Sequence, residues 1–213
     1  MKAVFLDRDG VINKLIYHHD HGIIDSPFTV EQFSLINGVG QAIKRLRGHH
    51  YRVILVSNQP GIAKGFFSRN IFQSIRKRMN DLLTISGTKL DGEYYCLHHP
   101  EAEISELRTI CACRKPEPGL LLRAAREMNI DLSPSWMVGD GITDIQAGKR
   151  AGCRTVLIGR MKCELCELMN KYDAVPDFIA PSLTEAAEYI LAKGDQQWKS
   201  SLTQRVSTIS KNG

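Results

Sequence analysis

Short apolar segments alternate along this chain with segments of helical period, and this alternation constrains the fold more than any other feature. The apolar segments have the β-branched and aromatic composition of buried strands and cover residues 3–6, 52–56, 90–95, 136–139 and 154–158. Apolar spacing and capping signals predict helices that follow Asn37 and Ser68 and that cover residues 118–128, 144–151 and 182–191. Strands that alternate with helices form a parallel sheet. We therefore expect an α/β fold with a doubly wound, mostly parallel, Rossmann-like sheet.

The size of the chain bears on the number of domains. With 213 residues, 43% of them hydrophobic, the chain can bury one full core. We expect a single domain over residues 1–193, followed by a polar, mobile tail over residues 194–213. The formal net charge of +5 suits an anionic small molecule and a nucleic acid equally well.

Signals for export and for membrane insertion are missing from the sequence. No basic and then apolar segment opens it, and no apolar run approaches the roughly 18 residues that a membrane span needs. We therefore expect a cytoplasmic protein, a monomer, without membrane contact.

Polar side chains follow three of the predicted strands at the point where each strand ends: Asp7, Asp9, Ser57, Asn58, Asp140 and Asp144. The carboxyl ends of parallel strands border the crevice in which open α/β sheets bind their ligands. We therefore expect these side chains to form one site, together with Arg114 and Lys115 from a loop. The alternatives are an ordinary turn after the first strand, and helix capping by Asp140 and Asp144.

The order of these motifs resembles that of the haloacid dehalogenase-like phosphohydrolases. The resemblance covers D-x-D-G-V-I-N at the start, S-N-Q after the second strand, R-K-P in the middle and G-D-x-x-x-D late in the chain. It implies that Asp7 attacks phosphorus and forms an aspartyl-phosphate. Asp9 would then protonate the leaving alcohol and later deprotonate the attacking water.

The same resemblance implies a magnesium ion and a phosphate site. The expected Mg²⁺ ligands are Asp7, the backbone carbonyl of Asp9, and Asp140. Ser57 and Asn58 would hold the phosphoryl oxygens, and Lys115 would neutralise them and orient Asp7. Asp144 would fix the loop, and Arg114 would contact a sugar hydroxyl or a second phosphate through its bidentate fork.

Two pairs of metal-ligating residues lie in the predicted loop over about residues 96–113: Cys96 and His98, and Cys111 and Cys113. Three thiolates and one imidazole complete a tetrahedral shell, which suits structural zinc. The alternatives are free thiols, and His99 as a ligand in place of His98. Because Arg114 and Lys115 directly follow Cys113, we expect zinc to fix where both cations point.

A narrower resemblance rests on D-R-D-G-V-I-N together with C-x-H-H-P and C-x-C-R-K-P. These motifs resemble the small branch of heptose 1,7-bisphosphate 7-phosphatases and histidinol-phosphatases, which has no separate cap domain. The sequence departs from this branch in two places. The loop after Asn13 is longer than is usual for the heptose enzymes, and Gly141 follows Asp140 where the branch usually has lysine.

The function expected from this resemblance is that of a Mg²⁺-dependent phosphatase for a small phosphorylated metabolite. D-glycero-D-manno-heptose 1,7-bisphosphate, losing its 7-phosphate in the synthesis of lipopolysaccharide precursors, is the first candidate substrate. The alternatives are a histidinol-phosphatase, a polynucleotide 3′-phosphatase and a non-catalytic, zinc-held binding module. We expect no nucleic-acid partner, because the chain has no basic groove interleaved with aromatic residues.

Two further groups of metal-ligating residues have simpler interpretations. The histidines near residue 20 (His18, His19 and His21) are predicted to lie in an irregular, solvent-facing loop, with a possible contact to substrate. Cys163 and Cys166 form an isolated C-x-x-C, which favours small residues on a peripheral helix over a redox or metal site.

Overall fold

The computed structural model describes residues 1–159, 169 and 171–194. The Cys163–Cys166 pair and the predicted tail beyond Gly194 lie outside these residues. A six-stranded sheet in the order β5-β4-β1-β6-β7-β8 forms the centre of the fold, and each neighbouring pair of strands is parallel. Its strands are β1 (Ala3–Leu6), β4 (Arg52–Asn58), β5 (Gly92–Cys96), β6 (Trp136–Gly139), β7 (Arg154–Ile158) and β8 (Phe178–Ala180). The predicted parallel sheet is confirmed, and β8 is a strand that the sequence analysis missed.

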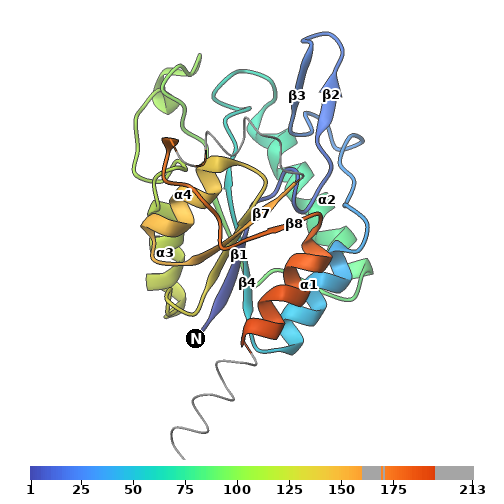
Figure 1. Cartoon of the computed structure of the whole chain (residues 1–213). Coiled ribbons are helices and arrows are strands. Elements are labelled where there is room, and N and C mark those ends of the chain that lie inside the picture. Colours follow the sequence, from blue (N-terminus) through green and yellow to red (C-terminus); the bar gives the residue numbers. More distant parts are fainter. Residues whose placement is uncertain (160–168, 170, 195–213) are drawn as a thin grey trace, which may run out of the picture.

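Helices cover both faces of the sheet, which confirms the doubly wound architecture (Figure 1). One face carries α1 (Val39–Gly48), α2 (Arg69–Ile85) and a helix over residues 183–194, and the other carries α3 (Gly119–Met128) and α4 (Ile142–Arg150). Side chains along β1 alternate between these layers. Val4 and Leu6 pack with the first layer, whereas Ala3 and Phe5 pack with the second, and all four are fully buried. Each large side chain buried in this way contributes about 1.5–3 kcal/mol.

A small hairpin replaces the irregular loop that was predicted after Asn13. The strands β2 (Ile16–His18) and β3 (Ile23–Asp25) pair antiparallel, with Tyr17 opposite Ile24 on an exposed face. The prediction was wrong because each strand has only three residues, which is too short for a clear alternation of apolar and polar residues.

His18 in this hairpin turns inward, contrary to the prediction of a solvent-facing loop. Its side chain is 7% exposed, its ring stacks on Phe28 at 3.6 Å between centroids, and its Nε2 lies 2.9 Å from the carbonyl oxygen of Ser26. His19 and His21 are exposed. These three histidines form no shared set of metal ligands in the described part of the chain.

Helix boundaries agree with the sequence analysis less well than strand positions do. Ser68 caps α2 as predicted, since its hydroxyl oxygen accepts the N–H of Ile71. Asn37 is not the cap of α1. That position belongs to Gly38, whose φ of 83° is left-handed and whose added Cβ would lie 2.8 Å from Thr184 Oγ1. Helix α4 begins at Ile142, two residues earlier than predicted.

The strand order determines where a site can form. It reverses at β1, which lies between β4 and β6, and ligands of open α/β sheets bind outside the carboxyl ends of the strands at such a point. In Figure 1 this is the upper edge of the sheet, between the β2–β3 hairpin and the loop that follows β5. No helix among the described residues is long and apolar enough to cross a membrane.

Candidate active site

The ends of β1, β4 and β6 place the predicted polar side chains along one edge. Asp7 directly follows β1, and its N–H donates to the carbonyl of Val138 in β6 at 2.9 Å. Ser57 and Asn58 are the last residues of β4, and Asp140 follows β6. The predicted convergence of these strand ends on one site is therefore present in the fold.

The glycine after the two first carboxylates allows the β1 loop to approach β6. Gly10 has a left-handed φ of 76°, and a Cβ added to it would lie 2.0 Å from Asp140 Oδ2. Any side chain at this position would therefore displace the carboxylate of Asp140.

Lys115 is the buried cation of the site. Its Nζ lies 2.9 Å from Asp7 Oδ1 and 2.5 Å from Asp144 Oδ1, and it donates to the carbonyl of Val56 at 3.0 Å. Burial alone would lower the pKa of Lys115, but the charges of Asp144 and then Asp7 outweigh it and hold that pKa above its ordinary value. The residue is 3% exposed, so a charged ammonium is fixed beside Asp7.

Asn58 holds the backbone of Lys115. Its Oδ1 accepts the N–H of Lys115 and its Nδ2 donates to the carbonyl of Lys115, each at 3.0 Å. Both ends of this side-chain amide are therefore used to join β4 to the loop that carries the cation.

Asp9 is held by three donors that the sequence analysis did not single out. Arg8 contacts both of its carboxylate oxygens, Asn13 Nδ2 donates to Oδ1 at 2.9 Å, and Gln59 Nε2 donates to Oδ2 at 2.6 Å. All three donors lie within D-R-D-G-V-I-N or S-N-Q, so their motif membership was the available signal. Their hydrogen bonds depend on tertiary contacts that spacing alone does not give.

Three carboxylates lie close enough to share a divalent cation. Oxygen atoms of Asp7, Asp140 and Asp144 all lie within 4.8 Å of one another. Desolvation and then the charges of Asp7 and Asp144 raise the pKa of Asp140 to about 7, although Asp140 remains exposed to solvent as a residue. A hard cation with oxygen ligands would relieve this repulsion, so the donor set fits Mg²⁺.

Asp144 combines two roles that the sequence analysis set against each other. Its Oδ2 accepts the N–H of Gly141 at 3.0 Å and so caps α4, while its Oδ1 contacts Lys115. Burial raises the pKa of Asp144 to about 6, with the ammonium of Lys115 opposing that rise. Asp144 therefore fixes both the helix start and the buried cation.

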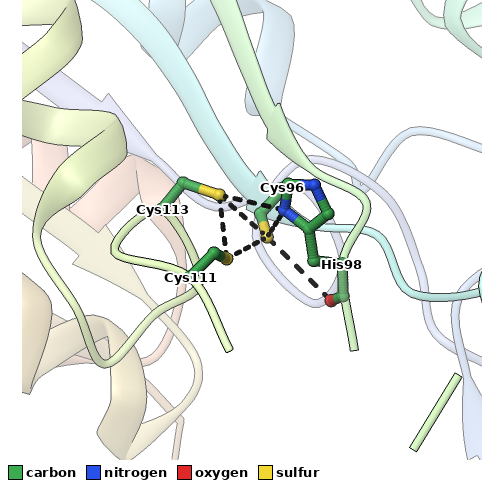
Figure 2. Close-up of side chains that lie close together, drawn as sticks. All are labelled: Cys96, His98, Cys111 and Cys113. Atoms are coloured by element: carbon green, nitrogen blue, oxygen red, sulfur yellow. Dashed lines mark hydrogen bonds between the residues drawn. The ribbon is translucent and has the colours of Figure 1, made fainter. Parts of the chain in front are cut away.

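The cysteine and histidine pairs of the loop converge on one point (Figure 2). Cys96 Sγ lies 3.6 Å from Cys111 Sγ and 3.3 Å from Cys113 Sγ, and His98 Nδ1 lies 3.4 Å from Cys113 Sγ. Four ligands about 2.3 Å from a tetrahedral zinc ion would lie about 3.8 Å apart, so the set fits a metal with little movement. His99 Nδ1 instead accepts the N–H of Glu101 at 3.1 Å.

This cluster joins the sheet to the basic segment of the site. Cys96 ends β5, beside β4, and Cys113 directly precedes Arg114. The Arg114 guanidinium donates to the carbonyl of His98 at 3.3 Å. The loop also contains the short 3₁₀ turn η1 (Ser105–Leu107), whose Leu107 is buried. Closing the cluster therefore restrains the chain on both sides of Arg114 and Lys115.

Comparison with known proteins agrees with the class that this fold and site define. The model of the HAD-hydrolase-like family matches residues 112–186. A D-glycero-beta-D-manno-heptose-1,7-bisphosphate 7-phosphatase of Yersinia pestis is 39% identical over 192 residues, which cover 90% of this chain and 96% of the relative. The protein of the same description from Escherichia coli (strain K12) is 40% identical over 158 residues, covering 74% and 78% of the two chains.

Among solved structures, a D,D-heptose 1,7-bisphosphate phosphatase from B. bronchiseptica, complexed with magnesium and phosphate, superposes with a TM-score of 0.73. It is 30% identical, and the match covers 91% of this chain and 99% of that one. The fold and site are those of a haloacid dehalogenase-like phosphohydrolase. Within that class, the chain belongs to the family of the heptose bisphosphate phosphatases, and it is a phosphoric monoester hydrolase.

Proposed function

We propose that this enzyme removes the 7-phosphate of D-glycero-D-manno-heptose 1,7-bisphosphate through an aspartyl-phosphate on Asp7. The observation that carries the proposal is the position of Asp7 at the switch point of the sheet. There it lies 2.9 Å from the ammonium of Lys115 and close to the carboxylates of Asp140 and Asp144. The names of the relatives support the choice of substrate.

Asp7 supplies the nucleophile. One of its carboxylate oxygens attacks phosphorus in line with the leaving oxygen, forming an O–P bond as the bond to the sugar oxygen breaks. Lys115 orients this carboxylate and offsets the negative charge of the incoming phosphoryl group, and the hydroxyl of Ser57 donates to a phosphoryl oxygen. Asn58, predicted to hold a phosphoryl oxygen, instead positions Lys115 through its two hydrogen bonds.

Asp9 carries the protons. It gives a proton to the departing sugar oxygen, and in the second half of the reaction it takes one from the water that attacks the aspartyl-phosphate. Phosphate then leaves and Asp7 is regenerated. The three donors around Asp9 hold its carboxylate at the edge of the site throughout this cycle.

Magnesium is the proposed cofactor. The carboxylates of Asp7 and Asp140, with the backbone carbonyl of Asp9, would hold it. A bound Mg²⁺ would neutralise the repulsion between a carboxylate and a phosphate dianion. Asp144 stays with Lys115 and with the start of α4.

Zinc is the proposed occupant of the cysteine–histidine cluster. Cys96, His98, Cys111 and Cys113 leave no open position, so this metal would be structural. It would act on catalysis only by fixing Arg114 and Lys115.

A monomeric state and a cytoplasmic location stay predictions.

Substrate selection is proposed to depend on the loops that border the site. These are the β2–β3 hairpin, the loop over residues 96–113 and residues 61–64. Arg114, half-buried and anchored to His98, would bind the distal phosphate or a sugar hydroxyl. Gly141 supplies no cation beside Asp140, so Lys115 would meet the central need for positive charge at the phosphate.

A phosphate-release screen tests the proposal. The wild-type enzyme with Mg²⁺ is assayed on both anomers of the heptose bisphosphate, on histidinol phosphate and on a 3′-phosphorylated oligonucleotide, with Asp7→Asn as the control. We expect the highest kcat/KM on a heptose bisphosphate and no turnover by Asp7→Asn, with its zinc content unchanged. A preference for histidinol phosphate or the oligonucleotide would overturn the substrate assignment, and an inactive wild type would favour a binding module.

A further inference from the structure

We propose that Gln59 is a positioning residue that sets both the proton-transfer carboxylate of Asp9 and the phosphate-binding hydroxyl of Ser57. The inference rests on the proposed function, since it assigns Gln59 a task within the two-step phosphoryl transfer. Gln59 is the third residue of the S-N-Q motif, and the mechanism above uses only the first two.

The side-chain amide of Gln59 bridges two elements of the site. Gln59 is 1% exposed, and its own N–H donates to the carbonyl of Cys96 at 2.7 Å where β4 ends. Its Nε2 donates to Asp9 Oδ2 at 2.6 Å and to Ser57 Oγ at 3.1 Å. One NH₂ group therefore uses both of its protons on the two groups that handle the proton and the phosphate.

The orientation of this amide follows from its neighbours. With the amide reversed, its carbonyl oxygen would face the carboxylate of Asp9, which is acceptor-only when ionised. With Nε2 as the donor, Ser57 Oγ accepts a hydrogen bond, and the proton of its own hydroxyl stays available. Ser57 is thereby set to donate to a phosphoryl oxygen instead of to the protein.

The carbonyl oxygen of the Gln59 amide has no described partner, which indicates that this side chain does not serve stability. Oε1 of Gln59 is buried and makes no hydrogen bond to any described residue. A buried carbonyl left without a partner costs about 1–3 kcal/mol. An unbranched apolar side chain such as methionine would fill similar space without that cost, so the amide is better explained by the two groups that it holds.

Gln59 also differs from the other donors to Asp9. Arg8 and Asn13 lie within four residues of Asp9, so their hydrogen bonds stay within the β1 loop. Gln59 comes from the end of β4, 50 residues along the chain, and β4 also carries Ser57. Of these donors, Gln59 is the one that fixes the distance between the proton donor and the phosphate site.

The test compares two leaving groups in Gln59→Met by rapid-quench kinetics. The sugar alkoxide of heptose bisphosphate needs a proton to depart, whereas p-nitrophenolate needs little help. We expect sugar release from the bisphosphate to fall by about 10²-fold, the effect of misplacing a reacting group by about 1 Å. With p-nitrophenyl phosphate, only the loss of Ser57 positioning slows the first step, so we expect a burst of nitrophenol within a few-fold of the wild-type rate. Slow steady-state turnover should follow, because water attack also needs Asp9.

Controls separate this role from a structural one and from failure of the proposed function. Thr88 also has a buried hydroxyl without a described partner, so Thr88→Val is a matched change and should leave both rates unchanged. Gln59→Leu gives a second variant if Gln59→Met does not fold. Wild-type rates in both Gln59 variants, or equal losses on both substrates with a lowered Tm, would overturn the inference. A wild type without phosphatase activity, or an active Asp7→Asn, would instead overturn the proposed function.

Discussion

The ammonium nitrogen of Lys115 lies 2.9 Å from Oδ1 of Asp7. Lys115 comes from the loop that follows the cysteine–histidine cluster, and Asp7 comes from the end of β1, so the contact joins two segments more than 100 residues apart. It is also a buried contact, with side-chain exposures of 2% and 15%. Removing one partner of such a buried ion pair strongly destabilises the folded protein, because the other charge stays buried without a partner.

Replacing Lys115 by methionine should therefore impair both folding and turnover. The carboxylates of Asp7 and Asp144 would remain buried without their shared cation, at a cost of about 3–5 kcal/mol. Urea denaturation should show a lower midpoint, and phosphate release should fall below detection. Asp144→Asn is the matched variant, because it removes one partner of Lys115 and leaves Asp7 paired. A Lys115→Met protein of normal stability would contradict the buried ion pair.

Gly10→Ala should weaken magnesium binding more than it weakens the fold. The new methyl group would lie 2.0 Å from Asp140 Oδ2, so the carboxylate of this proposed Mg²⁺ ligand must move. The left-handed φ adds about 1–2 kcal/mol of strain. A titration of activity with Mg²⁺ should need about 10-fold more cation than in the wild type, by analogy with the loss of a group that positions a metal ligand.

Gly22→Ala is the control for that experiment. Gly22 has a similar left-handed φ of 65° in the β2–β3 hairpin, but an added Cβ meets no atom within 4 Å. It should show comparable strain with an unchanged Mg²⁺ requirement. Equal shifts in both variants would mean that backbone strain alone is responsible.

Asp91 should make the stability of the protein fall at low pH. Burial raises the pKa of Asp91, but the N–H of Val53 and the ion pairs with Arg47 and Arg52 outweigh that effect and hold its pKa below the ordinary 3.8. The contribution of Asp91 to the free energy of unfolding is therefore complete above about pH 4, and it is lost as the pH falls through the lowered folded-state pKa.

The matched measurement uses Asp91→Asn. At pH 7 this variant should unfold more easily by about 1–2 kcal/mol, since it loses charge-assisted hydrogen bonds that are partly screened by solvent. Below about pH 4 the unfolding free energies of variant and wild type should converge. Asp91 precedes the amino end of β5, whereas the site lies at the carboxyl ends of the strands, so kcat at pH 7 should not change.

The parts of the fold that the sequence predicted are those with strong local periodicity. Apolar runs such as Trp136–Gly139 lie between helices of clear amphipathic spacing, so their positions and the parallel sheet were recognisable. The hairpin and β8 have three-residue strands whose pairing is set by the rest of the molecule, and no local pattern marks them. Helix starts were also harder, because Gly38 caps α1 without a side chain.

For the site, too, the sequence predicted one part and not another: which residues gather there, but not which hydrogen bonds they make. Motif spacing brought Asp7, Asp9 and Asp140 to one edge, and it brought the four sulfur and nitrogen ligands into one loop. It did not show which polar group holds which. Asn58 and Gln59 are neighbours in one motif, yet one joins the backbone of Lys115 and the other joins Asp9 to Ser57. Such pairings depend on tertiary contacts between the end of β4, the loop after β1 and the segment of Lys115, which sequence spacing does not encode.

Removal of zinc should abolish turnover through the position of Lys115. Without metal, no bond would hold Cys96, Cys111 and Cys113 together, and the loop would no longer restrain the segment that follows Cys113. We expect chelator-treated protein to lose phosphatase activity even with saturating Mg²⁺, and to regain it when zinc is restored. Cys153→Ala is the control, because Cys153 is a buried free thiol outside the cluster and its loss should change neither zinc content nor activity. Full turnover by zinc-free, folded protein would show that the cluster serves stability alone.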